Sequence, residues 1–235
     1  GEEGVVFVWH GSASGLNNGT SGDTTNYTWI AESDQPGGEL GYALASGDFN
    51  GDGYDDIACG VPYFDRGETD EGVVFVWHGS ASGLNNGTSG DTTNYTWIAE
   101  SDQAWAKLGY ALASGDFNGD GYDDIAVGAP NYDDGETNEG AVFVWNGSAS
   151  GLNNFYAWKA ESNQSDAYMH ICTAGDINND GYDDIKLYFL DNFPKQFHPG
   201  DFFEVSIWIL ILQNDAIEGQ TLTFTVELVA ENWSP

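Results

Sequence analysis

The feature that most constrains this chain is an internal duplication. Residues 4–35 recur without a change as residues 72–103, and a degenerate copy follows at 140–163. A second segment alternates with the first and begins at Leu40, Leu108 and Met169. The chain therefore consists of a half unit, two full units with a 68-residue spacing, and another half unit, followed by unrelated sequence. A repeat of this length predicts an architecture of small supersecondary units that pack on one another.

The apolar pattern inside each unit has a period of two, which is typical of β-strands. Val74 and Val76 alternate with Phe75 and Trp77, and Gly, Asn, Asp and Ser separate such runs. Signals for helix starts are missing. Four short antiparallel strands are expected in a full unit, at residues 41–46, 56–61, 72–78 and 95–99. That is the content of one propeller blade, so the predicted fold class is all-β with β-propeller-type blades.

The predicted domain organisation follows the repeats. Residues 1–190 form the repeat region, with a half unit at 1–35, full units at 36–103 and 104–163, and a half unit at 164–190. Residues 191–201 form a linker with two prolines. Residues 202–235 contain two alternating runs, FFEVSIWILIL and TLTFTVELVA, which predict a C-terminal β-hairpin with one very apolar face. Because a lone hairpin is not stable in water, we expect it to dock or to exchange strands.

The charge of the chain restricts its partners. It has 38 acidic against 5 basic side chains, a formal net charge of -33, which excludes nucleic acid and disfavours an anionic membrane surface. The natural partners are cations. The 40% hydrophobic and 14% aromatic residues predict a folded rather than a disordered protein. No run approaches the ~18 apolar residues of a membrane span. Residue 1 is not Met and no signal segment follows it, so a processed form or a fragment is expected.

The strongest chemical signal is the segment DFNGDGYDD at 48–56 and 116–124, with DINNDGYDD at 176–184. Side-chain oxygens occupy loop positions 1, 3, 5 and 9, and glycine occupies position 6. Calcium takes six to eight oxygen ligands, and three copies argue against a mere turn composition. We predict about three Ca²⁺ sites, with the position-7 backbone carbonyl as a further ligand: Asp48, Asn50, Asp52, Tyr54 and Asp56; Asp116, Asn118, Asp120, Tyr122 and Asp124; Asp176, Asn178, Asp180, Tyr182 and Asp184.

The neighbouring carboxylates at position 8, Asp55, Asp123 and Asp183, are expected to alternate outward into solvent. EF-hand and dockerin-like loops begin in the same way, but they place a carboxylate at position 12 and a helix after it. Position 12 here is Cys, Val or Leu. The loops are therefore expected inside β-hairpins.

The order LGYALASGDFNGDGYDDIAVGAP followed by EGAVFVWNGSASGL resembles the FG-GAP repeat of integrin α-subunit β-propellers and their prokaryotic relatives. The family's Phe-Gly is Leu-Gly or Gly-Tyr here, and its Gly-Ala-Pro corresponds to residues 60–62 and 128–130. The third copy lacks that tripeptide, and the resemblance extends over residues 1–185. It implies an extracellular adhesive module at the cell surface, with a protein or glycan ligand, in which calcium ions brace the blade hairpins.

Two other functions stay open. Two and a half to three units are fewer than the four to eight blades of a closed propeller, so either further blades lie elsewhere or subunits complete each other. The segments PGD and GQTLTFTVELVAEN near the C-terminus resemble the last strands of camelysin-type secreted fibre subunits, which polymerise by donating a strand. They favour a filament assembled head to tail by β-strand complementation. The other alternative is an accessory propeller of a larger secreted enzyme.

The sequence does not predict catalysis. His10 and His78 are repeat copies that become Asn146 in the third unit, and no GxSxG, HExxH or P-loop pattern occurs. The chain is expected to be non-enzymatic. Cys59 aligns with a valine of the next unit and Cys172 with a leucine of both earlier units, so both are expected as buried apolar residues without a disulfide.

The remaining candidate residues bear on location. Trp29, Trp97 and Trp158 end each unit and are expected in the inter-blade core rather than on a carbohydrate platform. Together with the calcium loops, sequons favour an extracellular or cell-surface location, with glycosylation left open. They are Asn18, Asn26, Asn86, Asn94, Asn146, Asn163 and Asn232.

Overall fold

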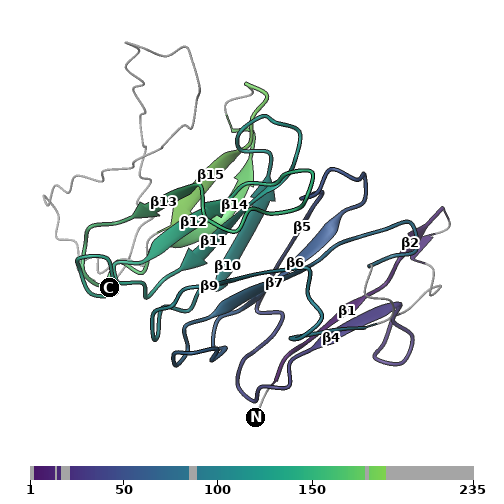
Figure 1. Cartoon of the computed structure of the whole chain (residues 1–235), viewed down its shortest axis with the longest axis horizontal. Helices are drawn as coiled ribbons and strands as arrows, with labels where there is room; N and C mark the ends of the chain where they lie inside the picture. The colour runs from purple at the N-terminus through teal and green to yellow at the C-terminus, as the bar shows by residue number, and fades with distance from the viewer. Residues whose placement is uncertain (1–2, 14, 17–21, 85–88, 178–179, 189–235) are drawn as a thin grey trace, which may run out of the picture.

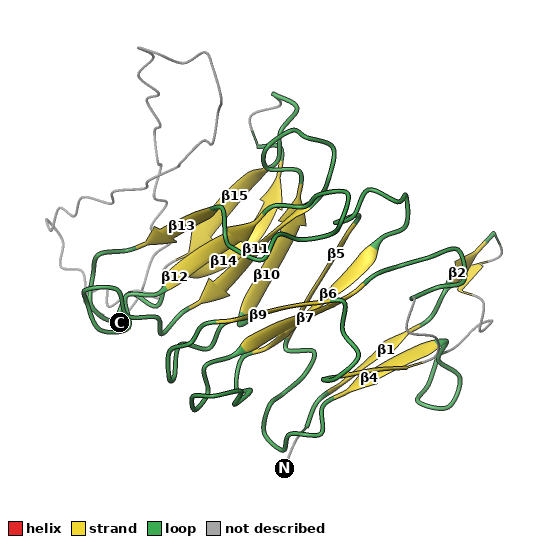
Figure 2. Cartoon of the chain, in the orientation of Figure 1, coloured by secondary structure: helices red, strands yellow, loops and turns green. Residues whose placement is uncertain are grey.

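The structure is a computed structural model of the whole chain, and it describes residues 3–13, 15–16, 22–84, 89–177 and 180–188 (Figure 1). The linker and the C-terminal hairpin expected at 191–235 lie outside these residues, as do Asn18, Asn86, Asn178 and Asn232. Every regular element of the described part is a β-strand (Figure 2), which confirms the all-β prediction. It contains no helix that is long and apolar enough to cross a membrane.

The two full units form two four-stranded antiparallel sheets of the same design. The first sheet has the order β5-β6-β7-β9 and the second the order β10-β11-β12-β13. The first pair of strands in each sheet flanks a carboxylate loop, as predicted. The bounds are β5 Ala43–Gly47, β6 Asp56–Val61, β7 Val73–Trp77, β9 Trp97–Glu100, β10 Ala111–Gly115, β11 Asp124–Ala129, β12 Ala141–Trp145 and β13 Trp158–Glu161.

The half units form smaller sheets on either side. At the N-terminal side β1 (Val5–Val8) pairs with β4 (Trp29–Glu32), and β4 also pairs in parallel with β8 (Ser89–Asp91). At the other side β14 (His170–Gly175) pairs with β15 (Asp184–Tyr188). A short ribbon joins β2 (Gly11–Ser12) to β3 (Gly15–Leu16). Figure 1 shows the sheets following one another in chain order, and in the described residues they do not close into a ring.

The hydrophobic core lies between consecutive sheets. The alternation within a strand sends neighbouring residues to opposite sides, so that Val73, Phe75 and Trp77 pack toward the first half sheet while Val74 and Val76 pack toward the second full sheet. A third cluster joins the second full sheet to β14 and β15. The two full sheets are therefore buried on both faces, which explains the continuous apolar runs of β7 and β12.

The predicted tryptophan core is confirmed at two of three positions. Trp29 is buried in the cluster between the first half sheet and the first full sheet, where its ring centre lies 5.4 Å from that of Trp77. Trp97 is buried one interface further along and lies 5.6 Å from Trp145. Trp158 is only half-buried and packs at the edge of the third cluster.

Glycines permit the close approach of one sheet to the next. Gly72 has φ +79°, and a Cβ there would overlap the backbone of Leu108 in the following unit. Gly60 has no room either, because a Cβ would overlap the carbonyl oxygen of Gly109. These two positions fix how near the blades can come.

The strand pairing does not keep the equivalence expected between Cys172 and Leu112, and the burial of Cys172 stays a prediction. In the second full sheet Leu112 pairs with Val127. The corresponding pair between β14 and β15 is Ile171 with Leu187, and the register shifts between Ile171 and Thr173. Cys172 therefore falls at the irregularity and not at the leucine position. Cys59 is buried as a free thiol, as expected, and burial raises its pKa to about 12.

Candidate cation-binding loops

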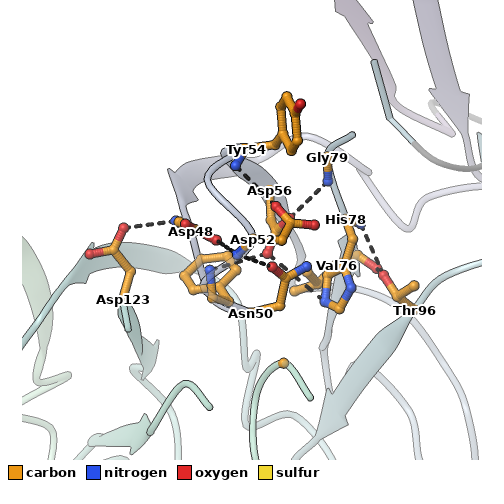
Figure 3. Close-up of polar contacts among 12 residues, drawn as sticks. Asp48, Asn50, Asp52, Tyr54, Asp56, Val76, His78, Gly79, Thr96 and Asp123 are labelled. Carbon is orange, nitrogen blue, oxygen red and sulfur yellow. Dashed lines mark hydrogen bonds and ion pairs between the residues drawn. The ribbon is translucent and has the colours of Figure 1, made fainter. Parts of the chain in front are cut away.

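The loop between β5 and β6 is built by its own side-chain oxygens (Figure 3). Asp48 accepts hydrogen bonds from the backbone N–H of Asp52 at 3.0 Å and of Gly53 at 2.8 Å. Asn50 accepts from the Asp52 N–H at 2.8 Å, and Asp52 accepts from the Tyr54 N–H at 3.0 Å. Such local turns explain why Asp, Asn and Gly occur at these positions, and they gather the oxygens of positions 1, 3 and 5 on one short loop.

The same bonds recur in the other two loops. Asp116 accepts from the N–H of Asp120 at 3.1 Å and of Gly121 at 2.9 Å, and Asp120 accepts from that of Tyr122 at 3.0 Å. In the third loop, the Asp176 carboxylate accepts from Asp180 at 3.1 Å and Gly181 at 3.0 Å, and Asp180 from Tyr182 at 3.0 Å. Repetition across three separate hairpins shows that the loop geometry follows from the local sequence.

The carboxylate at position 9 has a different environment. Asp56 is fully buried and accepts from the N–H of Phe49 at 3.1 Å and of Gly79 at 2.8 Å, so it ties the loop to the end of β7. Burial raises the pKa of Asp56 to about 7, and the charges of Asp52 and Asp48 add to this effect. Asp124 is buried in the same way, between the N–H groups of Phe117 and Gly147, and burial raises its pKa to about 7. In the third loop Asp184 accepts from the Ile177 N–H at 3.0 Å.

The donor chemistry of the loops suits a hard cation. The side chains predicted as ligands offer only oxygen, which calcium and magnesium prefer. A carboxylate oxygen that accepts one N–H keeps further lone-pair capacity. In the described part of the chain, however, no three His, Cys, Asp or Glu side chains converge as a metal-binding cluster. The residues thus fit a cation chemically, while the side chains at positions 1, 3 and 5 bond to their own loop backbone.

His78 lies beside the first loop, which the sequence did not predict. Its Nε2 is 3.9 Å from Asp56 Oδ2 and finds no hydrogen-bond partner among the described residues (Figure 3). Burial lowers the pKa of His78, and the nearby charges of Asp52 and Asp48 oppose that shift. The corresponding residue beside the second loop is Asn146. The first two loops therefore differ in this neighbour although their own sequences are identical.

The prediction that the position-8 carboxylates point outward was wrong for Asp123. Its Oδ2 accepts the backbone N–H of Asp48 at 2.8 Å, and its own N–H donates to the Asp48 carbonyl at 3.2 Å. Asp123 is half-buried, and burial raises its pKa. Asp183 is also engaged, because its N–H donates to the Asp116 carbonyl at 3.3 Å. Asp55 alone is exposed as predicted. The error arose because alternation along one loop says nothing about the adjacent loop.

A second repeated carboxylate site was missed. Glu71 is buried, and its Oε1 accepts the N–H groups of Arg66 at 2.7 Å and Glu68 at 3.2 Å. Glu139 is also buried, and its Oε1 accepts the N–H groups of Asp134 and Glu136 in the same way. The other oxygen of Glu139, Oε2, accepts the N–H of Asn163 at 3.0 Å. These two carboxylates therefore organise the loop before the third strand of each full sheet. The signal was present in the sequence as the copies GETDEG and GETNEG.

Four of the predicted sequons lie in the described residues. Asn26 and Asn94 are half-buried, and their Oδ1 atoms accept the indole N–H of Trp9 at 3.0 Å and of Trp77 at 3.1 Å. Asn146 is also half-buried, whereas Asn163 is exposed. Asn163 is thus the most accessible of these four asparagines.

Comparison with known proteins places these loops in a family context. The FG-GAP repeat model matches residues 40–77 and 108–145, which contain the first three strands and the carboxylate loop of each full sheet. Integrin alpha pat-2 of Caenorhabditis briggsae is 32% identical over 194 residues, covering 77% of this chain and 15% of that protein. Integrin alpha-6 of Homo sapiens is 40% identical over 116 residues, covering 48% of this chain and 9% of that protein.

A relative of another kind has a similar match. Phosphatidylinositol-glycan-specific phospholipase D of Mus musculus is 36% identical over 152 residues, covering 64% of this chain and 17% of that protein. The chain therefore spans less than a fifth of the length of these relatives.

Proposed function

The chain belongs to the integrin-alpha-like FG-GAP repeat family, and from that premise we propose that it is a calcium-binding, non-enzymatic recognition module of an extracellular or cell-surface protein. The observation that carries the proposal is the recurrence of one hydrogen-bonded oxygen-donor loop in successive β-hairpins. Similarity to integrin alpha chains supports an adhesive role with a protein or glycan ligand. We take residues 36–103 and 104–163 as the two full structural units of this module.

Calcium would be held by the side chains at loop positions 1, 3, 5 and 9 with the carbonyl at position 7. A bound cation supplies positive charge among carboxylates that otherwise repel one another in a chain of net charge -33. The chain's own residues do the rest. The position-9 carboxylates Asp56 and Asp124 anchor each loop to the third strand of its sheet, and the position-6 glycines donate to the position-1 carboxylates. The module would thereby be stiffened at one end of each blade.

Thermal unfolding with calcium and with a chelator tests the proposal. Binding to the folded state raises the free energy of unfolding by about 2.7 kcal/mol per site at a hundredfold excess over Kd. We expect calcium to raise the melting temperature and Asp120→Ala to reduce that gain. Asp55→Ala is the matched control, because it removes an exposed carboxylate at position 8 of the first loop. A melting temperature indifferent to chelation would contradict calcium binding.

The relation to phospholipase D supports a second candidate function. This chain could serve as the FG-GAP part of a larger secreted enzyme, since the mouse enzyme carries a matching region within a much longer protein. The gene that encodes the chain distinguishes the two candidates. A catalytic domain in the same open reading frame would establish the accessory role, and its absence would favour the adhesive one.

Assembly into a filament stays a prediction, and sedimentation of the purified chain with and without calcium tests it.

A further inference from the structure

We propose that Asp123 is a positioning residue for the preceding cation loop, so that the cation affinity of loop 48–56 depends on loop 116–124 of the next blade. This inference rests on the proposed cation binding and adds a coupling between sites. It assigns a role to a carboxylate that is not itself one of the predicted ligands.

Two hydrogen bonds in opposite directions form the connection. Asp123 Oδ2 accepts the Asp48 N–H at 2.8 Å, and the Asp123 N–H donates to the Asp48 carbonyl at 3.2 Å. Asp48 is position 1 of its loop, and its carboxylate also accepts from Asp52 and Gly53. Asp123, 75 positions away in the sequence, thus holds both the backbone N–H and the backbone carbonyl of Asp48, a predicted ligand.

Packing around this connection leaves little freedom. A Cβ on Gly47 would lie 2.7 Å from Asp123 Oδ2, and a Cβ on Gly51 would overlap the ring of Tyr122. Ser114 adds a hydrogen bond from its hydroxyl to the Ser46 carbonyl at 2.6 Å, and the Ser148 N–H donates to the Phe49 carbonyl at 3.2 Å. Loop 48–56 and its flanking strand β5 are therefore packed against the second full unit through both side-chain and backbone contacts.

The backbone bond and the close packing repeat once and have a direction. Asp183 donates its N–H to the Asp116 carbonyl, and Cβ atoms on Gly115 and Gly119 would overlap Asp183 and the ring of Tyr182. Each of the first two loops is thus held by the loop that follows it in the chain. Asp55 occupies the same position in the first loop, but it is exposed.

Holding the backbone of a ligand residue affects metal affinity, because the carboxylate must be aimed at the cation before binding. Loss of an outer-shell partner typically lowers metal affinity ten- to a hundredfold. A hydrogen bond to a charged acceptor is among the stronger ones. Removal of the Asp123 carboxylate should therefore weaken the first site while its own loop keeps all of its donors.

Calcium titrations monitored by NMR of backbone amide resonances measure the affinity of each loop separately. In the full 235-residue chain labelled with ¹⁵N, the position-6 amides of Gly53 and Gly121 report on the first and second loop, respectively. In Asp123→Ala the calcium midpoint of Gly53 should rise about tenfold or more, with the Gly121 midpoint changing by less than about threefold. Asp55→Ala is the matched control and should leave both midpoints within about threefold of the parent chain.

A conservative variant tests whether the bond or the charge matters. Asp123→Asn keeps an oxygen that can accept the Asp48 N–H, so it should restore the Gly53 midpoint to within about threefold of the parent value. Equal weakening of both loops in Asp123→Ala, or no change at Gly53, would overturn the inference. If neither amide of the parent chain responds to calcium, the proposed cation binding fails first. Faster hydrogen exchange of the Asp48 amide in metal-free Asp123→Ala would then still support the connection, and unchanged exchange would refute it.

Discussion

Residues 4–35 and 72–103 are identical in sequence, yet the fold places them in different surroundings. All five residues of β7 are buried, and Val73 is 0% exposed. In β1 only Val6 is buried, and Val5 is 44% exposed. The difference comes from the neighbours: β7 lies between β6 and β9, whereas β1 pairs with β4 alone among the described strands.

Local structure does not share this difference. Asn26 accepts the indole N–H of Trp9, and Asn94 accepts that of Trp77, at nearly equal distances. The turn before each asparagine is also the same, because Asp23 and Asp91 both accept from the threonine two residues later. The comparison shows that this turn and the strands β1 and β7 follow the sequence, while the short strands β2, β3 and β8, the burial and the stability depend on what the rest of the fold supplies.

The largest difference is expected in amide hydrogen exchange. Identical sequences have identical intrinsic exchange rates, so any difference between the copies reports on the fold. We expect those amides of Val5–Val8 that are not bonded to β4 to exchange about a hundredfold or more faster than their counterparts in β7. Exchange measured by NMR on assigned resonances distinguishes the copies. Equal protection would mean that the outer edge of β1 is covered.

The next largest difference is expected in the loss of unfolding free energy when the equivalent tryptophans Trp77 and Trp9 are replaced by alanine. Trp77 is fully buried against Trp29 and Phe75, so Trp77→Ala should lower the free energy of unfolding by about 3–5 kcal/mol. Trp9 is half-buried, and Trp9→Ala should cost clearly less, roughly 1–2 kcal/mol. Denaturant titration of the two variants measures both values. Equal losses would show that the first copy is as well packed as the second.

The smallest difference between the two copies is expected in the pKa values of Asp23 and Asp91, which belong to the same local turn. The Thr25 hydroxyl and N–H lower the pKa of Asp23, and those of Thr93 lower the pKa of Asp91. Because the folded-state pKa is depressed, this contribution to stability is present above the unfolded value of about 3.9 and is lost as the pH falls through the lower folded value. Carboxyl titration by NMR should show both groups below the ordinary value.

Threonine variants serve as controls for this titration. Thr25→Val and Thr93→Val should each raise the pKa of the neighbouring aspartate and leave the other copy unchanged. A clear disagreement between the two aspartates in the parent chain would mean that the turn depends on its surroundings after all.

Much of the fold and of the candidate loops was predictable, because it depends on residues close in sequence. Strand β6 has the predicted bounds, and the other strands of the first full sheet lie within two residues of the expected ranges. The loop geometry follows from Asx turns that need only the residues within the loop. The FG-GAP resemblance was recognisable from the sequence for the same reason, because the repeat motif is a contiguous stretch of residues.

The sequence by itself determined the alternation of strands, the turns and the oxygen-donor loops of this protein, because each arises from contacts within a few residues. Only the tertiary structure decided that Asp123 holds the loop of another blade, that Ser89–Asp91 pairs with β4 in parallel, and that Val5 is exposed while Val73 is buried. These outcomes depend on which sheet packs beside which. Packing joins residues tens of positions apart, and two identical segments cannot encode the difference between their neighbours.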